Sequence, residues 1–130
     1  MHVPDPANPI RVLAMDGSTV VLEAICSYLK TQGVVVVHVA RNGIELLDKA
    51  RVLAPDLIVL NIATTNMDAP ERVVRLRSLL PKARIIAFTV YDLLTTRDIF
   101  GEAGADSVIQ GEQKLPDRVV AEIRRMFPGE

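Results

Sequence analysis

Short apolar runs alternate along the chain with longer segments in which apolar residues recur every three or four positions. The runs are rich in β-branched residues, are too short for typical helices, and cover 10–15, 34–40, 56–61, 83–89 and 106–110. We interpret these runs as strands. The segments with helical spacing cover 19–32, 44–54, 69–80, 92–103 and 116–127. The pattern therefore predicts strands and helices in strict alternation.

Turn-forming and capping residues stand at the ends of these segments. Gly33 and Gly104 stop two of the predicted helices, and Pro55 and Pro81 stop two others, because proline cannot continue a helix. Asp68 is a suitable N-cap for the helix at 69–80. These residues support the same boundaries as the apolar pattern.

Two helices carry specific expectations about their faces. In 44–54, Ile44, Leu47 and Ala50 recur at helical spacing and predict the side that faces the core. In the last helix the apolar positions predict an inward face and the arginines an outward face. The inward set is Val119, Val120, Ile123 and Phe127, and the outward set is Arg118, Arg124 and Arg125.

Strand–helix pairs with short connections predict a doubly wound α/β domain, a parallel sheet with helices on both faces. The runs at 57–60 and 85–88 are continuously apolar, which is typical of strands buried on both faces. We expect one domain over 10–127, a flexible proline-containing tail at 1–9, and a short C-terminal end at 128–130. No internal repeat or second domain is expected.

Composition narrows the class of protein. The chain has 130 residues, of which 49% are hydrophobic, so a core can form without disulfides or metals. No apolar stretch suits a membrane span and the N-terminus lacks signal-peptide features, so we expect a cytoplasmic protein. The single cysteine, Cys26, suits a reducing compartment and is expected in the core. A net charge of −1 argues against direct nucleic-acid binding, so a protein partner is expected.

Ligands of open parallel sheets bind beyond the carboxyl ends of the strands, and this rule selects the candidate site residues. Asp16 and Gly17 follow the first predicted strand, Asn61 ends the third, and Thr89 ends the fourth. Gly111 follows the fifth. The candidate site is therefore mostly uncharged, with Asp16 as its one carboxylate.

Several of these segments match a known pattern. They are RVLAMDGS at 11–18, PDLIVLNI at 55–62, NMD at 66–68, ARIIAFTVYD at 83–92 and EAGADSVI at 102–109. Over about 10–127 the chain resembles the receiver domain of bacterial two-component response regulators. PDLIVL and EAGAD are most similar to receivers attached to helix-turn-helix transcription regulators. The resemblance implies a flavodoxin-like fold, shared with the chemotaxis response regulator, with strand order 2-1-3-4-5.

Active receivers of this family transfer a phosphoryl group from a phosphohistidine to their own aspartate. The resemblance places Asn61 at the phosphoacceptor position, where an amide cannot form an acyl phosphate. Gly17 replaces one member of the acidic pair, which leaves Asp16. Gly111 stands at the lysine position, and Lys114 would need a loop shift to replace it.

Four other positions complete the comparison with active receivers. Thr89 matches the switch hydroxyl, whereas Val108 stands where the switch aromatic is found. Thr64 and Thr65 replace the usual Met-Pro pair. A single Asn61 could come from an engineered substitution, but losses of three different kinds favour a domain that has lost phosphorylation.

We therefore expect a pseudo-receiver, not an enzyme, that acts in signal transduction or transcription regulation through a protein partner or as a homodimer. A sensor kinase or an attached DNA-binding output domain is the expected partner. Mg²⁺ binding is expected to be weak or absent, with Asp16 as the weak candidate ligand. The alternative is a phosphotransfer receiver or small enzyme with a non-standard acceptor. A flavodoxin-like small-ligand domain ranks last because no glycine-rich phosphate loop is present.

Structural roles compete with functional ones at several residues. Asp16 also suits a turn, Thr89 also suits a strand, and His38 is expected to be packed or hydrogen-bonded rather than catalytic. A basic cluster consists of Arg72, Arg75, Arg77, Lys82 and Arg84. We expect it to be a solvated face with a Glu71–Arg75 pair, and the alternative is that it docks an acidic partner.

Overall fold

The computed structural model describes residues 9–15, 19–62, 69–91, 95–111 and 113–128. Its strands are β1 (Arg11–Met15), β2 (Val35–Ala40), β3 (Leu57–Asn61), β4 (Arg84–Thr89) and β5 (Ser107–Gln110). Its helices are α1 (Thr19–Thr31), α2 (Gly43–Leu53), α3 (Ala69–Leu79), α4 (Thr96–Ala103) and α5 (Leu115–Met126). The strands form one parallel sheet in the order β2-β1-β3-β4-β5, which confirms the expected topology.

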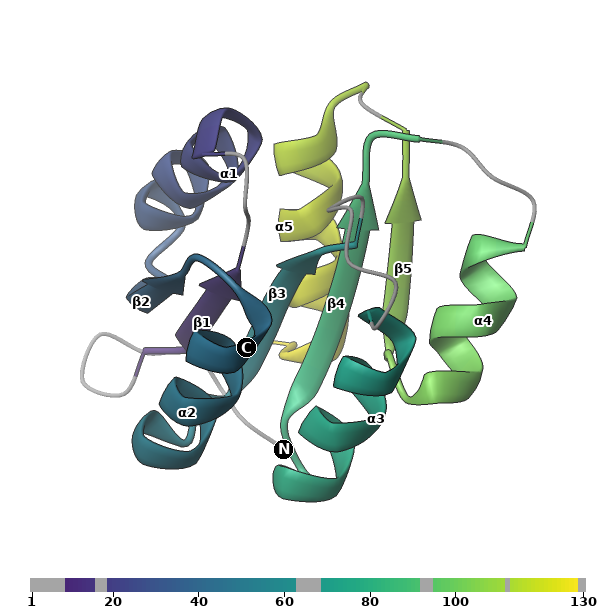
Figure 1. Cartoon of the computed structure of the whole chain (residues 1–130). Helices are drawn as coiled ribbons and strands as arrows, with labels where there is room; N and C mark the ends of the chain where they lie inside the picture. The colour runs from purple at the N-terminus through teal and green to yellow at the C-terminus, as the bar shows by residue number, and fades with distance from the viewer. Residues whose placement is uncertain (1–8, 16–18, 63–68, 92–94, 112, 129–130) are drawn as a thin grey trace.

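Helices cover both faces of this sheet, as expected for a doubly wound domain. In Figure 1, α2, α3 and α4 lie in front of the sheet, and α5 lies behind it. Side chains of β3 alternate between the two faces: Leu57 and Val59 join the core under α1 and α5, whereas Ile58 and Leu60 join the core under α2, α3 and α4. All four are fully buried, so the expected burial of this strand on both faces is confirmed.

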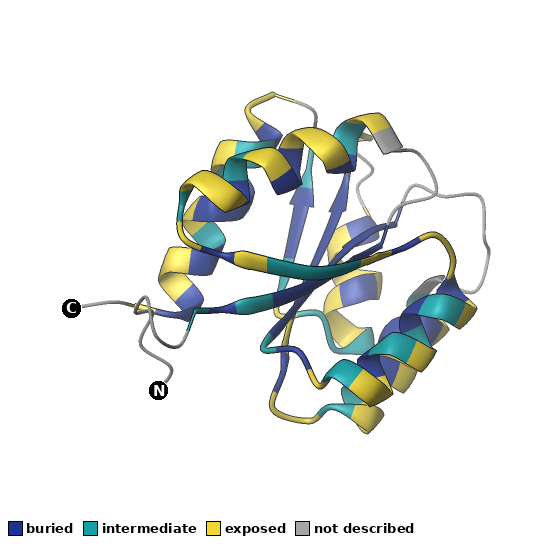
Figure 2. Ribbon diagram, turned by 90° about the vertical axis from the view of Figure 1, so that its left-hand side faces the viewer, coloured by how far each residue is buried: buried dark blue, intermediate teal, exposed yellow. Residues whose placement is uncertain are grey.

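The helices keep their outer sides in solvent while their inner sides form the two cores, and Figure 2 shows this as buried and exposed stripes along each helix. The expected inward positions of the last helix, Val119, Val120, Ile123 and Phe127, are buried. The described helices are all too short or too polar to span a membrane.

Each strand begins one residue later than its apolar run predicts. At two of these positions the first residue of the run is an aspartate that caps a neighbouring strand. Asp56 Oδ2 accepts from the Arg11 amide at 2.9 Å, and Asp106 Oδ2 accepts from the Ile85 amide at 2.8 Å. These side chains therefore satisfy backbone donors at the edge of the sheet instead of extending it.

The helix expected at 92–103 is shorter than predicted. It begins at Thr96, and residues 92–94 lie outside the described part of the chain. Thr96 and Phe100, one turn apart, are its buried residues, and Phe100 packs in the core that α4 shares with α2 and α3. Gly104, at a φ of +123°, ends the helix as predicted, a conformation that favours glycine.

The predicted core face of α2 is wrong at one position. Ile44 is 78% exposed, while Leu46 and Ala50 are fully buried. The helix begins at Gly43, after the Asn42 cap whose side chain accepts from the Glu45 amide at 2.9 Å. This start directs the row that contains Gly43, Leu46 and Ala50 toward the sheet and turns Ile44 away from it.

The basic cluster is not a uniformly solvated face. Arg77 donates to the Gly104 carbonyl at 2.9 Å and the Ala83 carbonyl at 2.6 Å, and it pairs with Asp106 at 2.6 Å. It thereby joins the turn before β4 to the turn before β5. Arg72 is also buried, at 7% exposed. The remaining members, Arg75, Lys82 and Arg84, are exposed, and the expected Glu71–Arg75 pair is present at 3.6 Å.

Candidate functional site

The carboxyl ends of β3, β4 and β5 meet at one edge of the sheet, where their arrowheads point in Figure 1. Asn61 is in register with Phe88, the residue before Thr89, and Thr89 is in register with Gln110, the residue before Gly111. The fold therefore brings Asn61, Thr89 and Gly111 to adjacent strand ends, as the sequence predicts.

The first strand approaches the same edge. Met15 is in register with Leu60, so the chain leaves β1 beside the end of β3. Asp16 and Gly17 lie outside the described residues, as do Thr64 and Thr65. The roles expected of these residues remain predictions.

Asn61 ends a strand whose other residues are aliphatic and fully buried. Its own exposed fraction is 6%, so the amide is held in the interior beside the sheet edge. A carboxamide offers an acceptor oxygen and a donor nitrogen, but it carries no negative charge and cannot attack phosphorus as a carboxylate does. Chemistry at this position is therefore limited to hydrogen bonding.

Thr89 is 3% exposed and connects two neighbouring segments. Its hydroxyl oxygen accepts from the Tyr91 amide at 3.1 Å, and its carbonyl oxygen accepts from the Gly111 amide at 3.0 Å. The side chain therefore supports the turn after β4, which is the structural role expected of a strand threonine. The hydroxyl proton can also be donated, so this geometry is compatible with a switch role.

The side chain of Val108 lies on the α2, α3 and α4 side of the sheet. It is buried with Ala87 and Phe100 in the cluster beneath α2, α3 and α4. An aliphatic side chain here fills space beside α4 and has no ring that could move between buried and exposed positions. Val108 therefore acts as a packing residue in this structure.

Gly111 has a left-handed backbone with a φ of +91°, which favours glycine over a residue with a side chain. Arg118 of α5 donates to the carbonyl oxygens of Gln110 at 2.6 Å, Gly111 at 3.2 Å and Gln113 at 3.3 Å. The prediction that Arg118 faces outward is wrong, because its guanidinium turns back to satisfy these three acceptors. Sequence reasoning missed this contact because no local motif links an arginine to carbonyls that precede it by up to eight residues.

Lys114 does not take the lysine position in this conformation. It is the exposed N-cap of α5, with a left-handed φ of 51°, and its carbonyl oxygen accepts from the Arg118 amide at 3.0 Å. Instead, the Arg118 guanidinium is the cation that contacts the end of β5, through the Gln110 and Gly111 carbonyls. It is engaged by backbone carbonyls.

Two other candidates have structural roles. His38 Nε2 lies 2.9 Å from Glu45 Oε1, which confirms that the histidine is hydrogen-bonded. The Arg41 amide and His38 lower the pKa of Glu45, with the amide as the larger cause. Cys26 is buried in the core as expected, and burial raises the pKa of its thiol, so it is a poor nucleophile.

A metal site requires several converging ligands. Among the residues that the structure describes, no group of three or more His, Cys, Asp or Glu side chains could hold an ion. The described part of the strand-end site provides the Asn61 amide and the Thr89 hydroxyl, both uncharged. This donor set is weak for a hard divalent cation, which prefers carboxylate oxygens.

Known proteins share both this sequence pattern and this fold. The response regulator receiver domain family matches residues 12–123. Response regulator protein VraR from Staphylococcus saprophyticus is 30% identical over 125 residues, which cover 94% of this chain and 58% of that protein.

Solved structures with the same fold include a CheY-like receiver domain protein from Methanospirillum hungatei. It has a TM-score of 0.81 at 24% identity and covers 92% of this chain and 94% of its own. A two-component response regulator of the LuxR family from an Aurantimonas species has a TM-score of 0.82 at 22% identity, covering 92% and 85%. At these identities the likeness establishes the flavodoxin-like, CheY-like fold.

The family match extends from β1 into α5 and so includes every strand of the sheet. Receiver domains of response regulators are two-component signalling domains and not enzymes, which confirms those two expectations. The chain spans 58% of the length of its VraR relative. On the family match and the shared fold together, this chain belongs to the response regulator receiver domain family.

Proposed function

We propose that this receiver domain signals by protein contact and is not switched by aspartyl phosphorylation. The observation that carries the proposal is Asn61, a buried amide at the end of β3, where the phosphoacceptor aspartate stands in active receivers. An amide cannot form the acyl phosphate. The domain therefore retains the receiver fold without the group that would receive the phosphoryl.

The fifth strand supports the same proposal. Gly111 takes a backbone conformation that disfavours a lysine, and the following loop is held by Arg118. Because three carbonyls engage the Arg118 guanidinium, this cation is occupied in the resting domain. Two requirements of phosphoryl transfer, the attacking oxygen and the free ammonium, are thus unmet at the ends of β3 and β5.

Receiver domains typically bind Mg²⁺ at an acidic site. The donors that this chain offers at the corresponding positions are the Asp16 carboxylate and the Asn61 amide, while Gly17 offers no side chain. One carboxylate and one amide are a poor match for a cation that prefers charged oxygen ligands. We therefore propose that the domain works without a resident Mg²⁺.

The proposed partners are other protein surfaces: a sensor kinase, an attached output domain, or a second copy of the chain. An attached DNA-binding output domain is supported by the similarity to VraR, of whose length this chain spans 58%, and in that case this domain itself would not contact DNA. We propose cytoplasmic transcription regulation as the setting, with the receiver unit at 10–127 between a tail at 1–9 and an end at 128–130.

The test is incubation with acetyl phosphate and Mg²⁺, followed by intact-mass measurement. The chain should gain no base-labile phosphoryl group, while a receiver with the usual aspartate, included in the same reaction, should gain one. A phosphoryl group on the wild-type chain would overturn the proposal and favour a non-standard acceptor.

The Asn61→Asp variant tests whether the missing phosphoacceptor alone blocks phosphorylation, or whether the missing metal ligand and lysine also do. It should also remain unmodified, because Gly17 and Gly111 still lack the metal ligand and the lysine. Efficient modification of this variant would show that Asn61 alone blocks phosphorylation, and would contradict the claim that the site is lost at several positions.

A further inference from the structure

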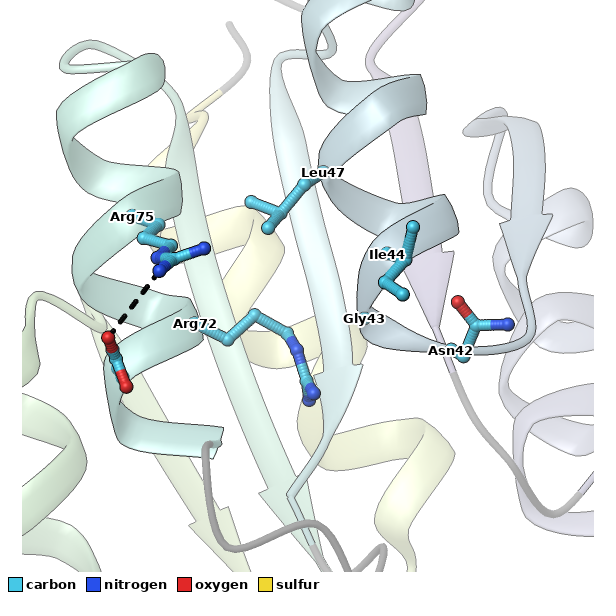
Figure 3. A pocket seen from close by; sticks show the side chains of 7 residues that line it. Asn42, Gly43, Ile44, Leu47, Arg72 and Arg75 are labelled. Carbon is cyan, nitrogen blue, oxygen red and sulfur yellow. Dashed lines mark ion pairs between the residues drawn. The ribbon is translucent and has the colours of Figure 1, made fainter.

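Arg72 is a buried cation with no counterion among the residues that the structure describes. It is 7% exposed, and none of the hydrogen bonds or ion pairs of the described residues reaches its guanidinium. In Figure 3 the side chain leaves α3, crosses toward α2 and ends beside Gly43. A buried charge is unfavourable without a partner, and the described residues supply none for Arg72, so a ligand for it is sought outside them.

The Arg72 guanidinium packs directly against the backbone of Gly43. A Cβ at Gly43 would lie 2.1 Å from Arg72 Nε and 2.4 Å from Cζ, so any side chain there would force the guanidinium to move. Gly43 is not among the glycines with positive φ, so its backbone does not require glycine. The missing side chain instead makes room for Arg72.

The surrounding field is positive. Arg72 lies in the first turn of α3 and approaches the first residue of α2, so the positive ends of two helix dipoles converge on it. The neighbouring carboxylates are engaged elsewhere: Glu45 contacts His38 and the Arg41 amide, and Glu71 pairs with Arg75. Among the described residues, therefore, no carboxylate forms an ion pair with Arg72.

A cleft of about 310 Å³ opens at this charge between α2 and α3. It is lined by Asn42, Gly43, Ile44, Leu47, Glu71, Arg72 and Arg75. Ile44, which is 78% exposed, and the half-buried Leu47 provide an apolar wall on the α2 side. In Figure 3 both side chains project from α2 beside the cleft, while the ion pair of Arg75 lies along α3.

We propose that this cleft docks an acidic side chain, Asp or Glu, of a protein partner, with Arg72 as its counterion and an aliphatic neighbour of that side chain on Ile44 and Leu47. A carboxylate suits the site better than a phosphate because its one negative charge matches the single charge of the Arg72 guanidinium, for which the described residues provide no counterion. A guanidinium can also donate two parallel N–H···O hydrogen bonds to the two oxygens of one carboxylate. This inference deepens the proposed function, since it names a partner chemistry for signalling by contact.

The test is an NMR titration of the ¹⁵N-labelled chain with the peptide acetyl-Leu-Glu-Leu-amide. The Gly43 and Ile44 amides and the Arg72 Nε–H should shift, and the Gln form of the peptide should bind about tenfold more weakly. Arg72→Gln should weaken binding of the Glu peptide by a similar factor. Arg75→Gln is the matched control and should change binding far less, because Arg75 already has a partner.

Arg72→Met provides a readout that does not depend on any peptide. If Arg72 is kept for docking, replacing the buried unpaired charge with an apolar side chain should raise the urea midpoint of unfolding. If Arg72 serves only the fold, the midpoint should fall, and the proposal is then wrong.

Other outcomes also overturn the proposal. Equal binding of the Glu and Gln peptides would remove the role of the carboxylate. Binding of inorganic phosphate at these amides without binding of the peptide would indicate a small-anion site instead. Neither result bears on the acetyl phosphate experiment, so failure of docking and failure of the proposed function can be told apart.

Discussion

Arg118 Nη2 donates to the carbonyl oxygen of Gln110 at 2.6 Å, and this contact ties the first part of α5 to the end of β5. The same guanidinium also donates to the Gly111 and Gln113 carbonyls. An arginine therefore holds the β5–α5 loop in its resting shape. In active receivers the lysine that follows this strand contacts the phosphoryl group instead.

Arg118→Gln should destabilise the domain by about 1–2 kcal/mol, because charge-assisted hydrogen bonds to three carbonyls are lost. Urea unfolding followed by circular dichroism measures the change. Arg51→Gln is a suitable control, since Arg51 is exposed on α2 and its replacement should change stability by less than about 0.5 kcal/mol. Equal effects of the two substitutions would show that the Arg118 contacts contribute little.

Gly111→Lys should destabilise the domain by about 1–3 kcal/mol, because a residue with a side chain is strained in this left-handed conformation. Gly101→Ala is the contrasting variant. Gly101 lies within α4 with nothing within 4 Å of an added Cβ, so alanine there should stabilise by about 0.5–1 kcal/mol. Thermal unfolding of both variants checks the prediction, which a neutral Gly111→Lys would contradict.

Gly43→Ala should destabilise the domain by about 1–3 kcal/mol, because its methyl group would collide with the Arg72 guanidinium. In an Arg72→Ala background the same change should cost far less, since the colliding group is gone. The difference between the two backgrounds, measured by urea unfolding as a double-mutant cycle, isolates the contact. Equal costs in both backgrounds would mean that Arg72 does not rest against Gly43.

Glu45 should contribute to stability at neutral pH and lose that contribution in acid. The Arg41 amide and His38 lower its pKa below the ordinary value of 4.5, so the folded state favours the carboxylate. The contribution is complete above pH 4.5 and disappears as the pH falls through the lower pKa of the folded state. In urea unfolding, wild type should therefore be more stable than Glu45→Gln at neutral pH, and the difference should shrink as the pH falls below 4.5. A difference that grows in acid would show the opposite sign and contradict the prediction.

Most of the architecture could be predicted because its signals are local. Apolar runs such as 57–60 are too short for helices and too continuous for strands with an exposed face. Pro81 cannot continue a helix because it lacks a backbone N–H, and Gly104 ends one because glycine readily takes a positive φ. The helix before Gly104 is the exception, because the sequence pattern from 92 onward does not indicate that α4 begins at Thr96.

The strand-end site was predictable for the same reason. Once the strands were placed, topology required Asn61, Thr89 and Gly111 to meet at one edge of the sheet. The identity of each residue then decided its chemistry: an amide, a hydroxyl and no side chain at all.

The amino-acid sequence by itself determined the alternation of strands and helices and the missing phosphoacceptor, since both depend on which residue stands at which position. Only the tertiary structure decided the roles of the arginines. A long, flexible cationic side chain can reach solvent, a carbonyl or a cleft from the same helical position. Packing between elements that are distant in sequence places Arg77 against Gly104 and Asp106, Arg118 against backbone carbonyls, and Arg72 against Gly43.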